Sequence, residues 1–166
     1  MLSQALQSDC LVDTYSSSLT IPISRTKFQK ANKSQVLAWY HMHSLPVTPI
    51  NPSTPTIKLS SASNASYQTV PSVSQLSDPS STALSFLTPP AITSKVLAEA
   101  QKAGVKSIWL QPGSFDDRIL EDAKGKFENV IGGYEEGTVG GEGWCVLVDG
   151  ENVLDEIGRS WKQQRL

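Results

Sequence analysis

The sequence is short of cysteine, of charge and of long apolar runs, and each shortage excludes a class of protein. Its two cysteines, Cys10 and Cys145, belong to no CxxC or Cys/His cluster, which disfavours a zinc site and a disulfide framework and fits a reducing compartment. Charged residues make up 18% of the chain and the net charge is −2, so it has no electrostatic footprint for nucleic acid or an anionic membrane. No apolar run reaches the length of a membrane span, and the first residues lack the basic and apolar parts of a secretory signal. We therefore expect a cytoplasmic protein whose partner is a small-molecule ligand or another protein.

Glycine is also missing from most of the chain, because all eleven glycines lie between Gly104 and Gly158. Glycine-rich loops let backbone amides approach phosphates, and neither a GxGxxG fingerprint nor a P-loop is visible. The stretch GGYEEGTVGGEG at residues 132–143 is rich in glycine but has no Gly-Lys-Ser/Thr ending, and its glutamates would repel phosphate. With no placed base or hydride-transfer site either, an NAD(P)-dependent oxidoreductase is the least favoured function.

What the chain does contain is a regular alternation of strand and helix patterns within 166 residues, a length that fits one domain. Apolar runs predict strands, and helical spacing with capping residues predicts helices. The expected strands cover 45–50, 82–88, 105–110, 127–131 and, as strand or extended chain, 144–149, with a weaker strand at 19–23. The expected helices cover 33–44, 90–103, a segment capped by Ser114 and 152–163, and residues 53–81 are expected to be loop with a helical turn at 73–76.

This alternation, with strands that are apolar throughout, predicts an α/β fold of the Rossmann-like, doubly wound type. We expect a mainly parallel sheet with helices on both faces, in three layers. Three strand ends share a proline: TPINPS after the strand at 45–50, LTPP after the next strand and LQPGS after the one following. Proline stops a strand ladder, and the carboxyl ends of parallel strands meet at one edge, so these loops are expected to line one crevice. Each of these three loops, taken singly, is also explained as an ordinary connection between a strand and a helix, for which proline and serine are common residues.

These segments carry a resemblance to a known family. In order and with plausible spacing, LPVTPINP, VPSVSQL, LSFLTPPAITSKVLAEAQKAGVKSIWLQPGS and CVLVDGE resemble the small CoA-binding-domain proteins, in particular fungal members. Those proteins are single Rossmann-like domains similar to the CoA-binding domain of the succinyl-CoA synthetase alpha subunit. The resemblance covers residues 25–166, which are expected to form the domain, and it leaves 1–24 as an atypical or poorly ordered N-terminal segment.

The resemblance implies a non-catalytic module that binds CoA, or a related adenine nucleotide, at the carboxyl edge of the sheet. Transferred by position, it implies contacts at three strand ends and, near residue 25, hydroxyl groups and positive charge for a phosphate. The implied contact residues are Asn51, Pro52 and Ser53; Thr88, Pro89 and Pro90; Trp109, Leu110 and Gln111; and Ser24, Arg25, Thr26 and Lys27. For Trp109, core packing is the competing interpretation. No metal is implied.

At its start the chain departs from that family, which opens with a strand and a Gly-Ala-Ser type loop. Here TIPISRTKFQKANKSQ stands in that place without a glycine. One explanation is that the chain is a diverged member with weakened binding. The favoured explanation is that an altered N-terminal segment replaces the usual first strand, in which case a central strand is absent or improvised. A protein-interaction or regulatory domain that kept the fold and lost the ligand is the alternative function.

The other reactive side chains indicate no reaction. His41 and His43 are two residues apart near a helix end and therefore face different ways, which makes them a poor metal pair. Cys145 stands in an apolar stretch with no adjacent His or Lys, which favours a structural thiol over a redox one. Asp116 and Asp117 begin an acidic helix face that is expected to be solvated.

Overall fold

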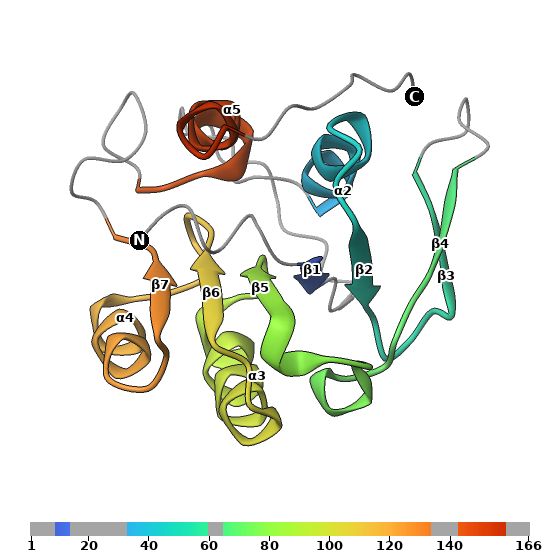
Figure 1. Cartoon of the computed structure of the whole chain (residues 1–166). Helices are drawn as coiled ribbons and strands as arrows, with labels where there is room; N and C mark the ends of the chain where they lie inside the picture. Colours follow the sequence, from blue (N-terminus) through green and yellow to red (C-terminus); the bar gives the residue numbers. More distant parts are fainter. Residues whose placement is uncertain (1–8, 14–32, 60–64, 134–142, 159–166) are drawn as a thin grey trace, which may run out of the picture.

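A five-stranded parallel sheet forms the centre of the molecule (Figure 1). The computed structural model describes residues 9–13, 33–59, 65–133 and 143–158. The strands of the sheet are β1 (Asp9–Asp13), β2 (Val47–Ile50), β5 (Thr82–Phe86), β6 (Ser107–Leu110) and β7 (Asn129–Ile131). Neighbouring strands follow the order β2-β1-β5-β6-β7. Because β1 lies between β2 and β5, the chain winds outward from the centre in both directions, which is the doubly wound arrangement.

Helices cover both faces of this sheet, as Figure 1 shows. The helices are α2 (Lys33–Met42) and α5 (Val146–Glu156) on one face, and α3 (Pro90–Ala103) and α4 (Asp117–Lys124) on the other. Every residue of β5 and β6 is buried: Ala83 and Trp109 pack with α2 and α5, whereas Leu84 and Ile108 pack with α3 and α4. Burial on both faces explains why these strands are apolar without alternation. The predicted α/β, Rossmann-like architecture in three layers is confirmed.

The central strand comes from a segment to which the sequence pattern assigned no strand. β1 pairs in parallel with β2 and β5, with Cys10 opposite Val47 and Leu11 opposite Leu84. The central strand is therefore present, which corrects the expectation of an absent strand, and it comes from the N-terminal segment 1–24 that was expected to replace the usual first strand. The apolar part of β1 is only three residues long, between two aspartates, which is too short to give a periodic signal. The strand predicted at 19–23 lies outside the described residues.

The segment between β2 and β5 covers the outer edge of the sheet. It contains an antiparallel hairpin of β3 (Thr56–Lys58) and β4 (Ser66–Gln68) and two short 3₁₀ turns, η1 (Val73–Gln75) and η2 (Pro79–Ser81). The turn predicted at 73–76 is confirmed, whereas the hairpin was not predicted because its strands are three residues long and contain no buried residue. Val70 donates its N–H to the carbonyl of Pro49, and its own carbonyl accepts from Asn51. Val70 thus pairs with the open side of the edge strand β2 around Pro49, a residue that accepts a hydrogen bond there but has no N–H to donate.

Two predicted helix boundaries are wrong. The N-cap of α4 is Asp116, whose Oδ1 accepts from the N–H of Ile119 at 2.8 Å, while Ser114 lies buried before the helix. Residues 146–149 are the first turn of α5 rather than a strand, so the last helix begins before residue 152. Its buried residues recur at helical spacing, namely Val146, Asp149, Gly150, Val153 and Leu154. By contrast, the predicted end of α3 at Gly104 is confirmed by the left-handed φ of 84° at that glycine.

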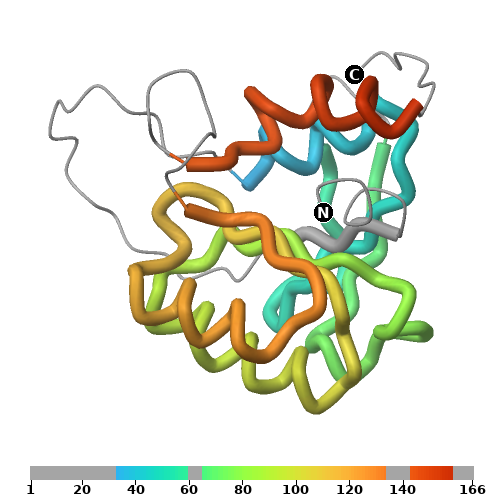
Figure 2. The backbone as a smooth tube through the Cα atoms, turned by 60° about the vertical axis from the view of Figure 1, so that its left-hand side comes forward, coloured from blue at the N-terminus to red at the C-terminus, as the bar shows by residue number. Residues whose placement is uncertain are grey.

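Helices α2 and α5 lie side by side over one face of the sheet, in both views (Figures 1 and 2). The backbone of Gly150 on α5 packs directly against the indole of Trp39, because an added Cβ would stand 2.4 Å from Cζ2 of that ring. His43 stacks on the same indole with ring centroids 4.0 Å apart and donates from Nδ1 to the carbonyl of Trp39. Its Nε2 lies 3.1 Å from Oε1 of Glu151 on α5. His43 is thus a buried packing residue between the two helices.

Candidate ligand site at the carboxyl edge of the sheet

The carboxyl ends of the five strands meet at one edge, because all neighbouring strands are parallel. Here the strand order reverses between β1 and β5, the position where open α/β sheets bind ligands. Three described segments follow strands at this edge: 51–53 after β2, 87–90 after β5 and 111–114 after β6. The sequence prediction that these loops share one edge is therefore consistent with the topology. Four predicted contact residues, Ser24, Arg25, Thr26 and Lys27, lie outside the described residues.

The segment after β2 is a turn fixed by its first residue. Asn51 is buried, and its Oδ1 accepts from the N–H of Ser53 at 2.9 Å. Such an Asx turn sets the direction of the chain as it leaves the strand. Pro52 and Ser53 are exposed at its tip. Of the three residues predicted here, Asn51 holds the turn and the other two face solvent.

The segment after β5 is held by a pair of buried threonines. The Oγ1 atoms of Thr88 and Thr93 lie 2.7 Å apart, and Thr93 also donates to the carbonyl of Thr88 at 3.1 Å. Because the hydroxyl proton of Thr93 serves that carbonyl, the proton between the two side chains comes from Thr88. Pro90 then begins α3, and Pro89 before it is exposed. The predicted proline wall is therefore present as the rigid entrance to a helix.

Gln111, the first residue after β6, uses all of its polar groups inside the protein. Its side chain donates from Nε2 to Oγ of Ser85 at 3.0 Å and accepts at Oε1 from the N–H of Val146 at 3.0 Å. Its backbone N–H donates to Phe86, and its carbonyl accepts from both the N–H and the Oγ of Ser114. The residue has no exposed surface. Gln111 therefore ties β5, β6 and the start of α5 together.

The last two strand residues before Gln111 are also buried. Trp109 is 2% exposed, and its Nε1 donates to the carbonyl of Trp144 at 3.0 Å. Leu110 points to the opposite face and packs in the cluster beneath α3 and α4. For Trp109 the structure agrees with the competing interpretation of core packing. The predicted edge residues whose side chains reach solvent are thus Pro52, Ser53 and Pro89, with Pro90 half-buried.

The start of α5 brings a carboxylate close to this edge. Oδ2 of Asp149 accepts from the N–H of Cys145 at 2.8 Å, at the start of a helix whose N-cap side chain, that of Cys145, makes no capping hydrogen bond. Burial raises the pKa of Asp149 above its ordinary value, and the hydrogen bond from Cys145 opposes this rise in the pKa. The thiol of Cys145 is half-buried beside it. Within the described ranges, no group of three His, Cys, Asp or Glu side chains is placed to hold a metal ion.

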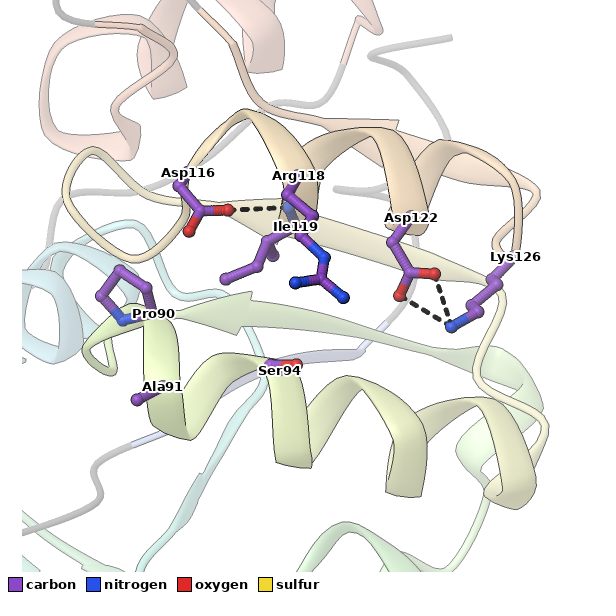
Figure 3. A pocket seen from close by; sticks show the side chains of 8 residues that line it. All are labelled: Pro90, Ala91, Ser94, Asp116, Arg118, Ile119, Asp122 and Lys126. Atoms are coloured by element: carbon purple, nitrogen blue, oxygen red, sulfur yellow. Dashed lines mark hydrogen bonds and ion pairs between the residues drawn. The ribbon is translucent and has the colours of Figure 1, made fainter.

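A groove of about 760 Å³ runs between α3 and α4 and starts at Pro90, the last residue of the predicted wall (Figure 3). Sequence reasoning missed it because the packing of two helices creates it. The residues that line it are Pro90, Ala91, Ser94, Asp116, Arg118, Ile119, Asp122 and Lys126. Arg118 and Asp122 are four residues apart on α4 and so share one helix face, but nothing in the sequence pattern shows that α3 lies opposite them. None of the described helices is long and apolar enough to cross a membrane.

Comparison with known proteins shows the fold and the family. Among solved structures, a hypothetical protein from Pyrococcus horikoshii OT3 is 15% identical with a TM-score of 0.61, covering 94% of this chain and 89% of that one. A conserved hypothetical protein from Pyrococcus furiosus is 22% identical with a TM-score of 0.55, covering 74% and 91%. A protein redesigned for binding is 15% identical with a TM-score of 0.58, covering 96% and 90%. At these identities the likeness shows the fold alone.

Comparison of the sequence itself is more specific. No curated protein matches the chain. Residues 24–134 match the family described as "CoA binding domain", a segment that contains all three described strand-end loops and both walls of the groove. This match spans four of the five strands of the sheet and three of its covering helices. The chain belongs to the CoA-binding-domain family.

Proposed function

We propose that the protein is a non-catalytic module that holds CoA, or a related adenine nucleotide, at the carboxyl edge of its sheet. The observation that supports this most is positional: the segment matching the CoA-binding family carries three strand-end loops beside the point where the strand order reverses. Buried threonine and glutamine side chains hold two of these loops rigid, and an Asx turn holds the third. Rigid loops lower the ordering cost of binding a flexible ligand.

In this proposal the exposed tips of the loops contact the ligand, and the buried residues position them. Ser53 and Pro52 lie near the ADP part, and Pro89 forms the wall beside it. The hydroxyls and positive charges of Ser24, Arg25, Thr26 and Lys27 serve a phosphate. Gln111 and Trp109 act through the loops that they hold, since their side chains are buried. Fungal origin and a cytoplasmic location stay predictions from the sequence.

A second function, a protein-interaction or regulatory domain without a nucleotide, is favoured by one specific observation. The polar side chains of Thr88 and Gln111 are fully buried and hydrogen-bonded within the protein, so they offer nothing to a ligand. The segment after β1, moreover, contains no glycine to admit a phosphate. The two functions differ in whether the folded chain binds any nucleotide.

Calorimetric titration of the full chain with CoA, acetyl-CoA, ADP and NAD tests the proposal. CoA is expected to bind, and Ser53→Asp is expected to weaken it about tenfold by placing a carboxylate beside the phosphates. Ser77→Asp is the matched control, because this exposed serine precedes β5 and so lies toward the amino ends of the strands, away from the carboxyl edge. No heat with any nucleotide from folded protein would support the second function, and a preference for NAD would revive the oxidoreductase.

A further inference from the structure

The groove between α3 and α4 contains charged side chains that the proposed function leaves unused. Two carboxylates, from Asp116 and Asp122, and two cations, from Arg118 and Lys126, line it. Figure 3 shows Asp116 at the end near Pro90, Lys126 at the other end, and the guanidinium of Arg118 extending between them from α4 toward α3. A volume of about 760 Å³ lies within the range of small-molecule sites.

Three of these four charges already have partners within the protein. Asp116 caps α4 through the N–H of Ile119 at 2.8 Å. Lys126 pairs with Asp122 through an N–O distance of 2.6 Å. The guanidinium of Arg118, by contrast, makes no hydrogen bond or ion pair with any residue in the described part of the chain. The groove therefore holds one cation, that of Arg118, which makes no ion pair inside it.

The wall opposite Arg118 adds a second polar group and an apolar surface. Ser94 of α3 faces the groove, and its hydroxyl has no partner among the described residues. Pro90 and Ala91 on α3 and Ile119 on α4 provide apolar surface next to it. A planar guanidinium binds a carboxylate through two parallel hydrogen bonds, and a serine hydroxyl can donate a third.

We propose that this groove binds small molecules that carry a carboxylate on an apolar body, with the carboxylate on Arg118 and Ser94 and the body against Pro90, Ala91 and Ile119. A single negative charge matches the single unpaired cation. A phosphate dianion fits less well, because the carboxylates of Asp116 and Asp122 lie on either side of Arg118 and repel the second charge (Figure 3). The groove shares Pro90 with the proposed nucleotide site, but its binding groups, Arg118 and Ser94, lie outside that site, so the test of the groove does not require CoA.

The test uses three probes with the same ring and different heads: benzoate, benzamide and phenyl phosphate. Each is titrated into the ¹⁵N-labelled full chain, and the backbone amide shifts are followed by NMR. Benzoate is expected to give saturable shifts at Ala91, Ser94 and Ile119, with the millimolar affinity of a small ligand, and to leave the amides of Asn51 and Ser53 unmoved. Benzamide is expected to bind about tenfold more weakly, since charge-assisted hydrogen bonds are lost. Phenyl phosphate is also expected to bind more weakly than benzoate, because the carboxylates of the groove repel its second negative charge.

The variants isolate the guanidinium. Arg118→Gln is expected to weaken benzoate about tenfold or more, and Arg118→Lys about threefold, because lysine keeps the charge without the planar fork. Lys102→Gln removes one positive charge from the exposed last turn of α3, outside the groove, and is expected to leave the affinity unchanged. Arg118 is exposed, so both variants should keep the fold, which the dispersion of the same spectra reports.

Four results would overturn the proposal. They are an absence of saturable benzoate shifts in the groove, equal binding of benzoate by Arg118→Gln, equal binding of benzamide, and tighter binding of phenyl phosphate. The first would leave the groove a solvated surface, the second would remove Arg118 from any site, and the last two would show that the head group recognised is not a carboxylate.

Discussion

The two faces of the sheet are covered in different ways. Beneath α3 and α4 the buried cluster is made of aliphatic and phenylalanine side chains, with one threonine pair at the edge. Beneath α2 and α5 the layer combines two indoles with buried polar groups from Ser85, Gln111 and Asp149. Apolar burial has no directional requirement, whereas each buried polar group must find its partner. The layer beneath α3 and α4, here the apolar layer, therefore stabilises the fold through the apolar surface that it buries. The layer beneath α2 and α5, the polar layer, also fixes the positions of the groups that it joins.

This difference matters for the proposed nucleotide site. The hydrogen bonds of Gln111 join two strand ends and the start of α5 at the carboxyl edge, all from the α2–α5 side. The geometry of the site is thus expected to depend on the polar layer, and the stability of the domain on both layers. Substitutions at matched positions in the two layers test this comparison.

The largest effect is expected from Gln111→Leu, compared with Leu110→Met on the opposite face. Leucine keeps most of the volume but leaves the hydroxyl of Ser85 and the N–H of Val146 without partners, which should cost about 3 kcal/mol. Leu110→Met conserves volume in the apolar layer and should cost less than about 1.5 kcal/mol. Urea denaturation of both variants measures the difference. Equal costs would mean that the polar layer tolerates change as readily as the apolar one.

Gly150→Ala is expected to lower the free energy of unfolding by up to about 2 kcal/mol. Alanine favours a helix over glycine by about 1 kcal/mol, but its Cβ would stand 2.4 Å from the indole of Trp39, and overpacking costs about 1–3 kcal/mol. Gly125→Ala is the matched control, because Gly125 has a helical φ and its added Cβ meets nothing closer than 3.6 Å. Thermal denaturation compares the two, and a stabilised Gly150→Ala would show that the indole can move aside.

The sequence predicted the apolar layer better than the polar one, and the reason is physical. Periodic apolar spacing located α3, and Gly104 located its end, because local backbone preferences decide both. It did not locate the start of α5, where the run Val146–Val148 also fits a strand until the later buried residues are counted. β1 was missed because three apolar residues carry no period.

The same limit applies to the candidate site. The pattern placed Gln111 at a strand end, but its partners Ser85 and Val146 lie 26 and 35 residues away along the chain. No local rule shows that the amide is already bonded to both. Arg118 went unnoticed for a similar reason, since the groove exists only once α3 and α4 are packed together. Sequence reasoning found the segments of the site, and tertiary packing decides which side chains are exposed.

Asp149→Asn is expected to change the pH dependence of stability more than its value at pH 7. Burial raises the folded-state pKa of Asp149 above its ordinary value of 3.8, so the folded protein holds a proton at a pH where the unfolded chain has lost it. The contribution of Asp149 to the free energy of unfolding is therefore most favourable below pH 3.8. It falls as pH rises from 3.8 through the raised pKa. Asparagine keeps an acceptor for Cys145 and removes the titration, with a change of less than about 1 kcal/mol at pH 7. Denaturation of both proteins between pH 3 and 7 should give curves that diverge as pH falls, and parallel curves would contradict the raised pKa.

The smallest effect is expected from Lys126→Gln, which breaks an ion pair on the outside of the apolar layer. Lys126 and Asp122 are both substantially exposed, and their nearest charged atoms lie 2.6 Å apart one helical turn from each other. Water and salt screen such pairs, so the loss should be about 0.5 kcal/mol or less and should vanish in 1 M salt. The loss from Gln111→Leu should persist in the same salt, because its hydrogen bonds are buried. A salt-independent loss at Lys126 would show that the groove holds this pair away from solvent. Exposed fraction would then be a poor guide to which interactions salt can screen, and salt would not separate this pair from the buried bonds of Gln111.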